Sequence, residues 1–241
     1  MNIKETDKSF VAGTYGRFDL CLMRGEGAKV WDDCGNEYID MGAGIAVNTF
    51  GYSDGAWADA VCEQVRRLQH TSNLYFTEPC ARLAEMLCEK TGMKKVFFSN
   101  SGAEANECAI KVARKYAFQK WGDESHSNII TLRNSFHGRT VTTLAATGQD
   151  TFHTDFGPFP EGFAYCEANN TDELCQMIDS GRFCAVLMET VQGEGGVNVL
   201  TEEFVRAASE KCREKDMLLM IEAHLAVRRV VDRLQAVKQR R

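Results

Sequence analysis

Short, unbroken apolar runs alternate along the chain with longer stretches in which apolar residues recur at helical spacing. The unbroken apolar runs are residues 96–98, 184–188 and 217–221, residues 128–132 are a further predicted strand, and turn-forming or polar residues follow all four. A strand that is buried on both faces reads as a continuous apolar run, and a helix between successive strands lets them lie parallel. The pattern therefore predicts an α/β fold with a mostly parallel sheet covered by helices.

Four further segments are predicted to be helices because apolar residues recur along them at the helical period, namely residues 54–70, 77–90, 171–180 and 201–215. Partly alternating sequence within residues 1–50 indicates a small antiparallel hairpin with its turn near Gly35-Asn36. Residues 148–170 contain two prolines and four phenylalanines and are interpreted as a long irregular connection.

Residues 96–120 predict a strand, a polar turn and a long helix that ends at Trp121-Gly122. Ser101 and Glu104 fit a capping box at the start of this helix. Gly102 and Ala103 have almost no side chain, so an anion such as phosphate can approach the first-turn N–H groups closely. An ordinary capped helix that binds nothing is the alternative interpretation of the same residues.

Composition narrows the class of protein. Of 241 residues, 44% are apolar and 26% charged, which is normal for a globular chain. The net charge of −6 gives no basic excess for nucleic acid. Ten scattered cysteines indicate buried or half-buried thiols of a reducing, cytoplasmic compartment, and no metal-ligand spacing accompanies them. We find no signal peptide, no membrane-spanning stretch and no dinucleotide or P-loop motif.

Polar residues follow the apolar runs at four places where ligands bind in a parallel sheet. They are residues 101–103, residues 136–139, residues 189–194 and Glu222. Together they supply an anion cradle, an aromatic face, a guanidinium and several carboxylates. Taken singly, Phe136 is also explained as a core residue, Arg139 as a surface charge and Glu222 as a helix cap.

Five motifs give these positions a joint meaning: GIAV at 44–47, SNSGAEANE at 99–107, FHGRT at 136–140, TGQ at 147–149 and QGEGG at 192–196. In this order and spacing, over about residues 10–221, the sequence resembles the class III aminotransferases, which use pyridoxal 5'-phosphate. The resemblance implies a fold-type-I transferase, two small-molecule substrates (an amino donor and a 2-oxo acid), and a homodimer in intact relatives.

The resemblance also implies roles for individual residues. Gly102 and Ala103 would hold the cofactor phosphate through backbone N–H groups, and Phe136 would stack on the pyridine ring. Arg139 would bind the substrate carboxylate through a bidentate fork.

Three glutamates complete the implied site. Glu194 matches a position that helps to sort substrate ends, and Glu189 one that supports the site from behind. Glu222 stands where the family has the aspartate that pairs with the pyridinium nitrogen, and it is longer by one methylene group.

From residue 222 onward the sequence departs from the family pattern. Where the family reads Asp-Glu-Val-Gln, this chain reads Glu-Ala-His-Leu, and residues 222–241 carry six Lys or Arg against two acids. The family's Schiff-base lysine has no counterpart, since Lys238 stands in a basic tail. We therefore expect an N-terminal arm and small-domain segment (residues 1–50), a partial cofactor domain (51–221) and a divergent tail (222–241) of a truncated copy.

Within the family, the sequence is most similar to the acetylornithine type, which implies amino transfer from N-acetylornithine to 2-oxoglutarate in arginine biosynthesis. Ornithine and 4-aminobutyrate aminotransferases remain alternatives. A different class of hypothesis is a non-catalytic fragment that binds the cofactor or dimerises.

Overall fold

The computed structural model describes residues 2–223, which divide into two compact units between Cys80 and Ala81. Lys238 and the rest of the predicted divergent tail beyond Ala223 lie outside the described residues. Within residues 2–223, no helix combines the length and the apolar character that crossing a bilayer requires.

The N-terminal unit is built around a three-stranded antiparallel sheet in the order β1-β2-β3. The hairpin predicted near Gly35-Asn36 is confirmed, because β2 and β3 pair on either side of this turn. The Asp32 carboxylate fixes the turn by accepting hydrogen bonds from the backbone of Cys34 and from Asn36 and Tyr38. The elements of this unit are α1 (Ile3–Phe10), β1 (Leu22–Glu26), β2 (Lys29–Asp32), β3 (Glu37–Ile39), α2 (Ala43–Ala46) and α3 (Gly55–Arg67).

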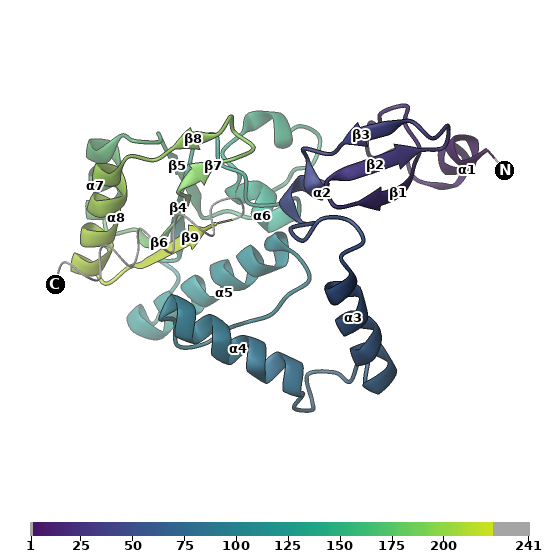
Figure 1. Cartoon of the computed structure of the whole chain (residues 1–241). Coiled ribbons are helices and arrows are strands. Elements are labelled where there is room, and N and C mark those ends of the chain that lie inside the picture. The colour runs from purple at the N-terminus through teal and green to yellow at the C-terminus, as the bar shows by residue number, and fades with distance from the viewer. Residues whose placement is uncertain (1, 224–241) are drawn as a thin grey trace. The chain divides into compact units, whose positions relative to one another are not determined.

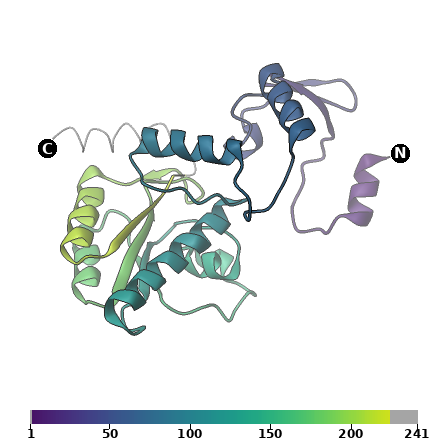
Figure 2. The ribbon, with the colours of Figure 1, turned by 90° about the horizontal axis from the view of Figure 1, so that it is seen from below.

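The second unit contains a four-stranded sheet in the order β5-β4-β6-β9, in which all neighbours are parallel. Figures 1 and 2 show α5 on one side of this sheet and α7 and α8 on the other. The predicted parallel sheet covered by helices is therefore confirmed. The main elements are α5 (Gly102–Trp121), β4 (Asn128–Leu132), β5 (Phe163–Cys166), α7 (Thr171–Asp179), β6 (Phe183–Glu189), α8 (Glu202–Glu214) and β9 (Leu218–Glu222).

Smaller elements connect these. They are α4 (Glu78–Thr91), which crosses the boundary between the units, α6 (Val141–Ala146), the 3₁₀ turn η1 (Asp150–Phe152) and the two-stranded ribbon β7 (Val191–Gln192) and β8 (Asn198–Val199).

Each face of the parallel sheet has its own hydrophobic core. Ile130 and Val186 pack with Phe204 and other residues of α7 and α8. Ile129 and Leu187 pack on the other face with Ile110 and its neighbours on α5. All seven residues of β6 are buried, because both of its faces are covered. This explains why residues 183–188 of β6 form a continuous apolar run.

Two predictions about strands are wrong. Residues 96–98 form no strand, and Phe97 and Phe98 are exposed. A short apolar run becomes a strand only where a neighbour pairs with its backbone, and within residues 2–223 no segment does so. Residues 148–170 are not wholly irregular, since β5 lies within them. Its pairing with β4 satisfies backbone groups at that edge of the sheet.

The cysteines are more varied than predicted. Cys166, Cys184 and Cys212 are buried, and desolvation raises the pKa of the Cys166 and Cys212 thiols to about 12. The interpretation of all ten as buried or half-buried is wrong, because Cys34, Cys62 and Cys80 are exposed. The buried thiols therefore behave as small apolar side chains that resist ionisation.

Candidate functional site

The N-terminus of α5 lies at the edge of the sheet where the parallel strands end. Ser101 Oγ accepts a hydrogen bond from the N–H of Glu104 at 3.2 Å, as the capping box predicts. The return bond differs, because the Glu104 carboxylate accepts from the N–H of Asn100 at 2.6 Å rather than from that of Ser101. The first-turn N–H groups of Gly102 and Ala103 have no acceptor within the helix and therefore suit an anion.

The loop after β4 packs directly against this helix end. Gly138 adopts φ +126°, and a Cβ added there would lie 2.7 Å from Cβ of Ala103 and 2.7 Å from Oγ1 of Thr143. Both the backbone conformation and the space require glycine. The FHGRT motif is thereby held against the start of α5.

Phe136 and Arg139 flank this close contact. Phe136 is half-buried, and its ring centroid lies 5.6 Å from that of Phe152 in a tilted arrangement. Arg139 is exposed, and its guanidinium carbon lies 5.9 Å from the centre of the Phe152 ring. One aromatic side chain thus contacts both predicted site residues.

Glu222 ends β9 beside the same helix. Its Oε2 accepts hydrogen bonds from Nδ1 of His137 at 2.7 Å and from Nδ2 of Asn106 at 2.9 Å. Asn106 also donates to the backbone oxygen of His137 at 2.8 Å. The other oxygen, Oε1, lies 4.0 Å from the position that a Cβ on Gly102 would take. The structure therefore brings together Gly102 and Glu222, which are far apart in sequence.

Asn106 and His137 are two site residues whose roles were not predicted from the sequence. Asn106 stands one turn after Gly102 on α5, and this spacing is the signal that places it on the same end of the helix. His137 is buried beside Phe136, and its Nε2 has no hydrogen-bond partner within the described residues.

Glu189 lies at the end of β6 and is 6% exposed. Its Oε2 accepts the N–H of Phe136 at 2.9 Å, so it fixes the backbone at the aromatic residue. Burial raises the pKa of the Glu189 carboxyl above its ordinary value, and the charge of Glu222 acts in the same direction.

Glu189→Gln is expected to make the unfolding free energy less dependent on pH. The variant keeps an oxygen for the Phe136 N–H. The pKa of Glu189 is higher in the folded protein than its unfolded value of 4.5. Below pH 4.5 the carboxyl is protonated in both states and does not destabilise the fold, and wild type then loses stability as the pH rises from 4.5 toward the folded pKa. Urea unfolding of both proteins from about pH 4 to pH 8 measures the difference.

The exposed Glu194→Gln variant is the control for this measurement. If it changed the pH profile as much as Glu189→Gln does, the effect would come from net charge, and the proposed cost of burying Glu189 would be wrong.

Glu194 is not brought into this group. It is exposed in the turn between β7 and β8. Its neighbour Gly195 packs so closely on the loop after β4 that an added Cβ would collide with the backbone oxygen of Asn134. The QGEGG motif therefore contacts the FHGRT loop through its backbone, whereas the Glu194 side chain stays outside.

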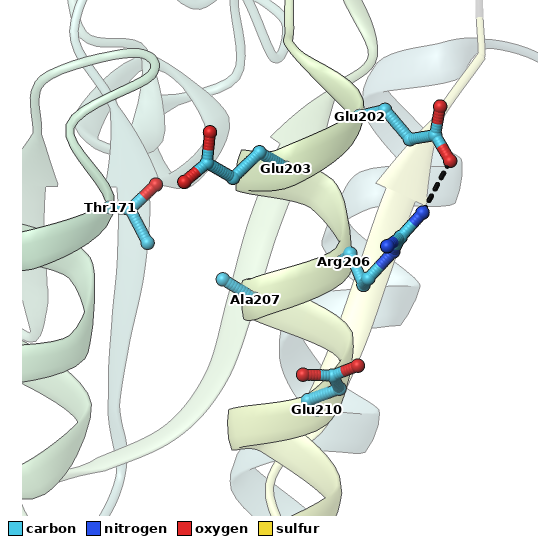
Figure 3. A pocket seen from close by; sticks show the side chains of 6 residues that line it. All are labelled: Thr171, Glu202, Glu203, Arg206, Ala207 and Glu210. Carbon is cyan, nitrogen blue, oxygen red and sulfur yellow. Dashed lines mark hydrogen bonds and ion pairs between the residues drawn. The ribbon is translucent and has the colours of Figure 1, made fainter.

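A separate surface hollow lies along α8 and the start of α7 (Figure 3). Its lining includes three carboxylates, those of Glu202, Glu203 and Glu210. The guanidinium in the hollow, that of Arg206, pairs with Glu202. This excess of negative charge makes it a poor site for an anionic ligand, in contrast to the N-terminus of α5.

Comparison with known proteins bears directly on this arrangement. The family model for "Aminotransferase class-III" matches residues 10–222, which is most of the chain. The chain belongs to the class III aminotransferases. Among curated members, acetylornithine aminotransferase of Haemophilus ducreyi is 51% identical over 220 residues, which cover 91% of this chain and 56% of that protein.

Succinylornithine transaminase of Salmonella paratyphi A is 42% identical over 219 residues, which cover 91% of this chain and 53% of that protein. The crystal structure of ornithine aminotransferase from Toxoplasma gondii matches with a TM-score of 0.85 at 31% identity, over 90% of this chain and 52% of that one. This class III chain thus spans about half the length of the curated relatives it matches, and the sequence-based assignment of family and fold is confirmed.

Proposed function

We propose that the chain binds pyridoxal 5'-phosphate where β4, β6 and β9 end, and that the protein transfers an amino group from an N-acylated ornithine to 2-oxoglutarate. The observation that carries the proposal is the meeting of Glu222 with the N-terminus of α5. It combines an anion site with an acidic side chain whose second oxygen, Oε1, lies near Gly102. A phosphorylated pyridine needs both features.

The residues present fit this cofactor. The N–H groups of Gly102 and Ala103 would hold the phosphate at the positive end of the α5 dipole. Phe136 offers a half-buried ring for stacking, and Glu189 fixes its backbone. Glu222 would accept from the ring nitrogen. When bound, pyridoxal phosphate supplies an electron sink that makes the Cα proton of an amino acid removable.

Substrate recognition is proposed for Arg139 and Glu194. The exposed Arg139 guanidinium would pair bidentately with a substrate carboxylate, and its contact with Phe152 limits its orientations. Glu194 would act only from a different loop arrangement, since it lies exposed between β7 and β8. The names of the relatives favour N-acetylornithine or N-succinylornithine as donor over ornithine or 4-aminobutyrate.

The domain boundaries, a homodimeric assembly and a cytoplasmic location belong to the same proposal. They are supported by membership of the family alone. A second candidate function is cofactor binding without transamination, and the Glu222-Ala223 sequence favours it because the family has Asp-Glu there.

The full 241-residue chain is expected to bind pyridoxal phosphate at least tenfold more tightly than inorganic phosphate when both are titrated by isothermal calorimetry. The reason is that phosphate contacts only α5, whereas the cofactor also reaches Phe136 and Glu222. Transamination assays with N-acetylornithine, N-succinylornithine, ornithine and 4-aminobutyrate separate the candidate donors. Binding without turnover would select the second candidate, and equal affinity for the two ligands would contradict both.

A further inference from the structure

We propose that His137 and Asn106 are positioning residues that fix Glu222 so that its Oε1 faces the cofactor's ring nitrogen. This inference rests on the proposed function. His137 and Asn106 act on the ligand only through Glu222.

The two oxygens of Glu222 are unlike each other. Oε2 accepts from both His137 and Asn106, at 2.7 and 2.9 Å, whereas Oε1 lies toward Gly102. Two donors on one oxygen fix the position and the plane of the carboxylate group. The oxygen that accepts neither bond is therefore directed toward the start of α5.

A glutamate needs this restraint more than the aspartate that occupies the position in the family. It has one more rotatable bond, and ordering it costs more conformational entropy. Here the donors themselves are fixed. The His137 side chain is fully buried, and Asn106 is tied to the His137 backbone oxygen at 2.8 Å. The pair thus compensates for the longer side chain of Glu222.

The chemistry of the contact assigns the hydrogen. An ionised carboxylate only accepts, so the 2.7 Å contact places a proton on Nδ1 of His137. Glu189 on the neighbouring strand β6 stands opposite Glu222 in the parallel register, and its carboxylate interacts electrostatically with both His137 and Glu222. A donor at Nδ1 offsets the repulsion between the two carboxylates and holds Glu222 in place.

The test compares His137→Leu with His137→Asn in the full chain. Leucine keeps an apolar body in the buried site but removes the donor. Asparagine places an N–H close to the position of Nδ1. Three ligands are titrated by isothermal calorimetry: inorganic phosphate, pyridoxal phosphate, and its 1-deaza analogue, in which carbon replaces the ring nitrogen.

We expect His137→Leu to weaken pyridoxal phosphate about tenfold, because the acceptor for the ring nitrogen is no longer held. The same variant should leave phosphate and the 1-deaza analogue within about twofold of wild type. His137→Asn should restore most of the affinity for pyridoxal phosphate. Asn106→Ala removes the second donor and should act in the same direction, which keeps the test decisive if His137→Leu fails to fold.

Equal weakening of all three ligands by His137→Leu would mean a purely structural role and would overturn the inference. So would unchanged affinity for pyridoxal phosphate. A different result, in which wild type itself binds pyridoxal phosphate no better than phosphate, would instead contradict the proposed function on which the inference rests.

Discussion

Gly138→Ala is expected to destabilise the second unit by about 3 kcal/mol or more and to lower its affinity for pyridoxal phosphate more than tenfold. The added Cβ would overlap Ala103 and Thr143, and at φ +126° an alanine is strained in any case. Relief requires the FHGRT loop to move away from the start of α5, which separates Phe136 from the phosphate cradle. Urea unfolding and a cofactor titration measure the two effects.

Gly181→Ala is the matched control. Gly181 also has positive φ, +73°, but nothing lies within 4 Å of its Cβ position. Gly181→Ala should lower the free energy of unfolding by only about 1–2 kcal/mol, because of backbone strain, and should leave the affinity for pyridoxal phosphate unchanged. If Gly138→Ala and Gly181→Ala had the same effect on stability and on cofactor affinity, the close contact between Gly138 and Ala103 would not be the cause, and the explanation given for Gly138→Ala would be wrong.

Phe204→Ala is expected to lower the free energy of unfolding by about 3–5 kcal/mol. Phe204 projects from α8 with no exposed surface, into the core that covers one face of the parallel sheet. Its removal loses the transfer free energy of the ring and leaves a cavity that the fixed strands cannot fill. Chemical denaturation with a far-ultraviolet signal measures the loss.

Phe118 on α5 gives the control for this substitution, because 51% of it is exposed. Phe118→Ala should cost less than about 1 kcal/mol. A similarly small cost for Phe204→Ala would show that α8 does not close the core as described.

The sheet was predictable from sequence because its strands carry their own signal. β6 and β9 are apolar up to the glutamate that ends each strand, and β6 is buried along its whole length because both faces of the sheet are covered there. Thr201 marks the start of α8, and Gly122 marks the end of α5. Residues 96–98 carry the same signal without a paired neighbour. Local pattern cannot tell these two situations apart, because the presence of a partner strand is a property of the whole fold.

The candidate site was predictable only in part, for a related reason. The resemblance pointed to Gly102, Phe136 and Glu222, but the hydrogen bonds that hold Glu222 come from His137 and Asn106 on other elements. In the sequence Asn106 has no feature that distinguishes it from other helix residues. Its role depends on the Glu222 carboxylate at the end of β9, to which its amide donates a hydrogen bond. Glu194 shows the converse, because a motif position gives no information about which way a loop side chain points.

The hydrogen bond between Asn106 and Glu222 joins residues 116 positions apart. Forming such a contact requires the long chain segment between the two residues to lose conformational freedom first. We therefore expect the ligand site to be among the last parts of the unit to form. A ligand that binds there engages only molecules whose parallel sheet is complete through β9, and it shifts the folding equilibrium as a whole. Protection from proteolysis by pyridoxal phosphate should accordingly extend across β4, β6 and β9 together, rather than stopping at the loops that touch it.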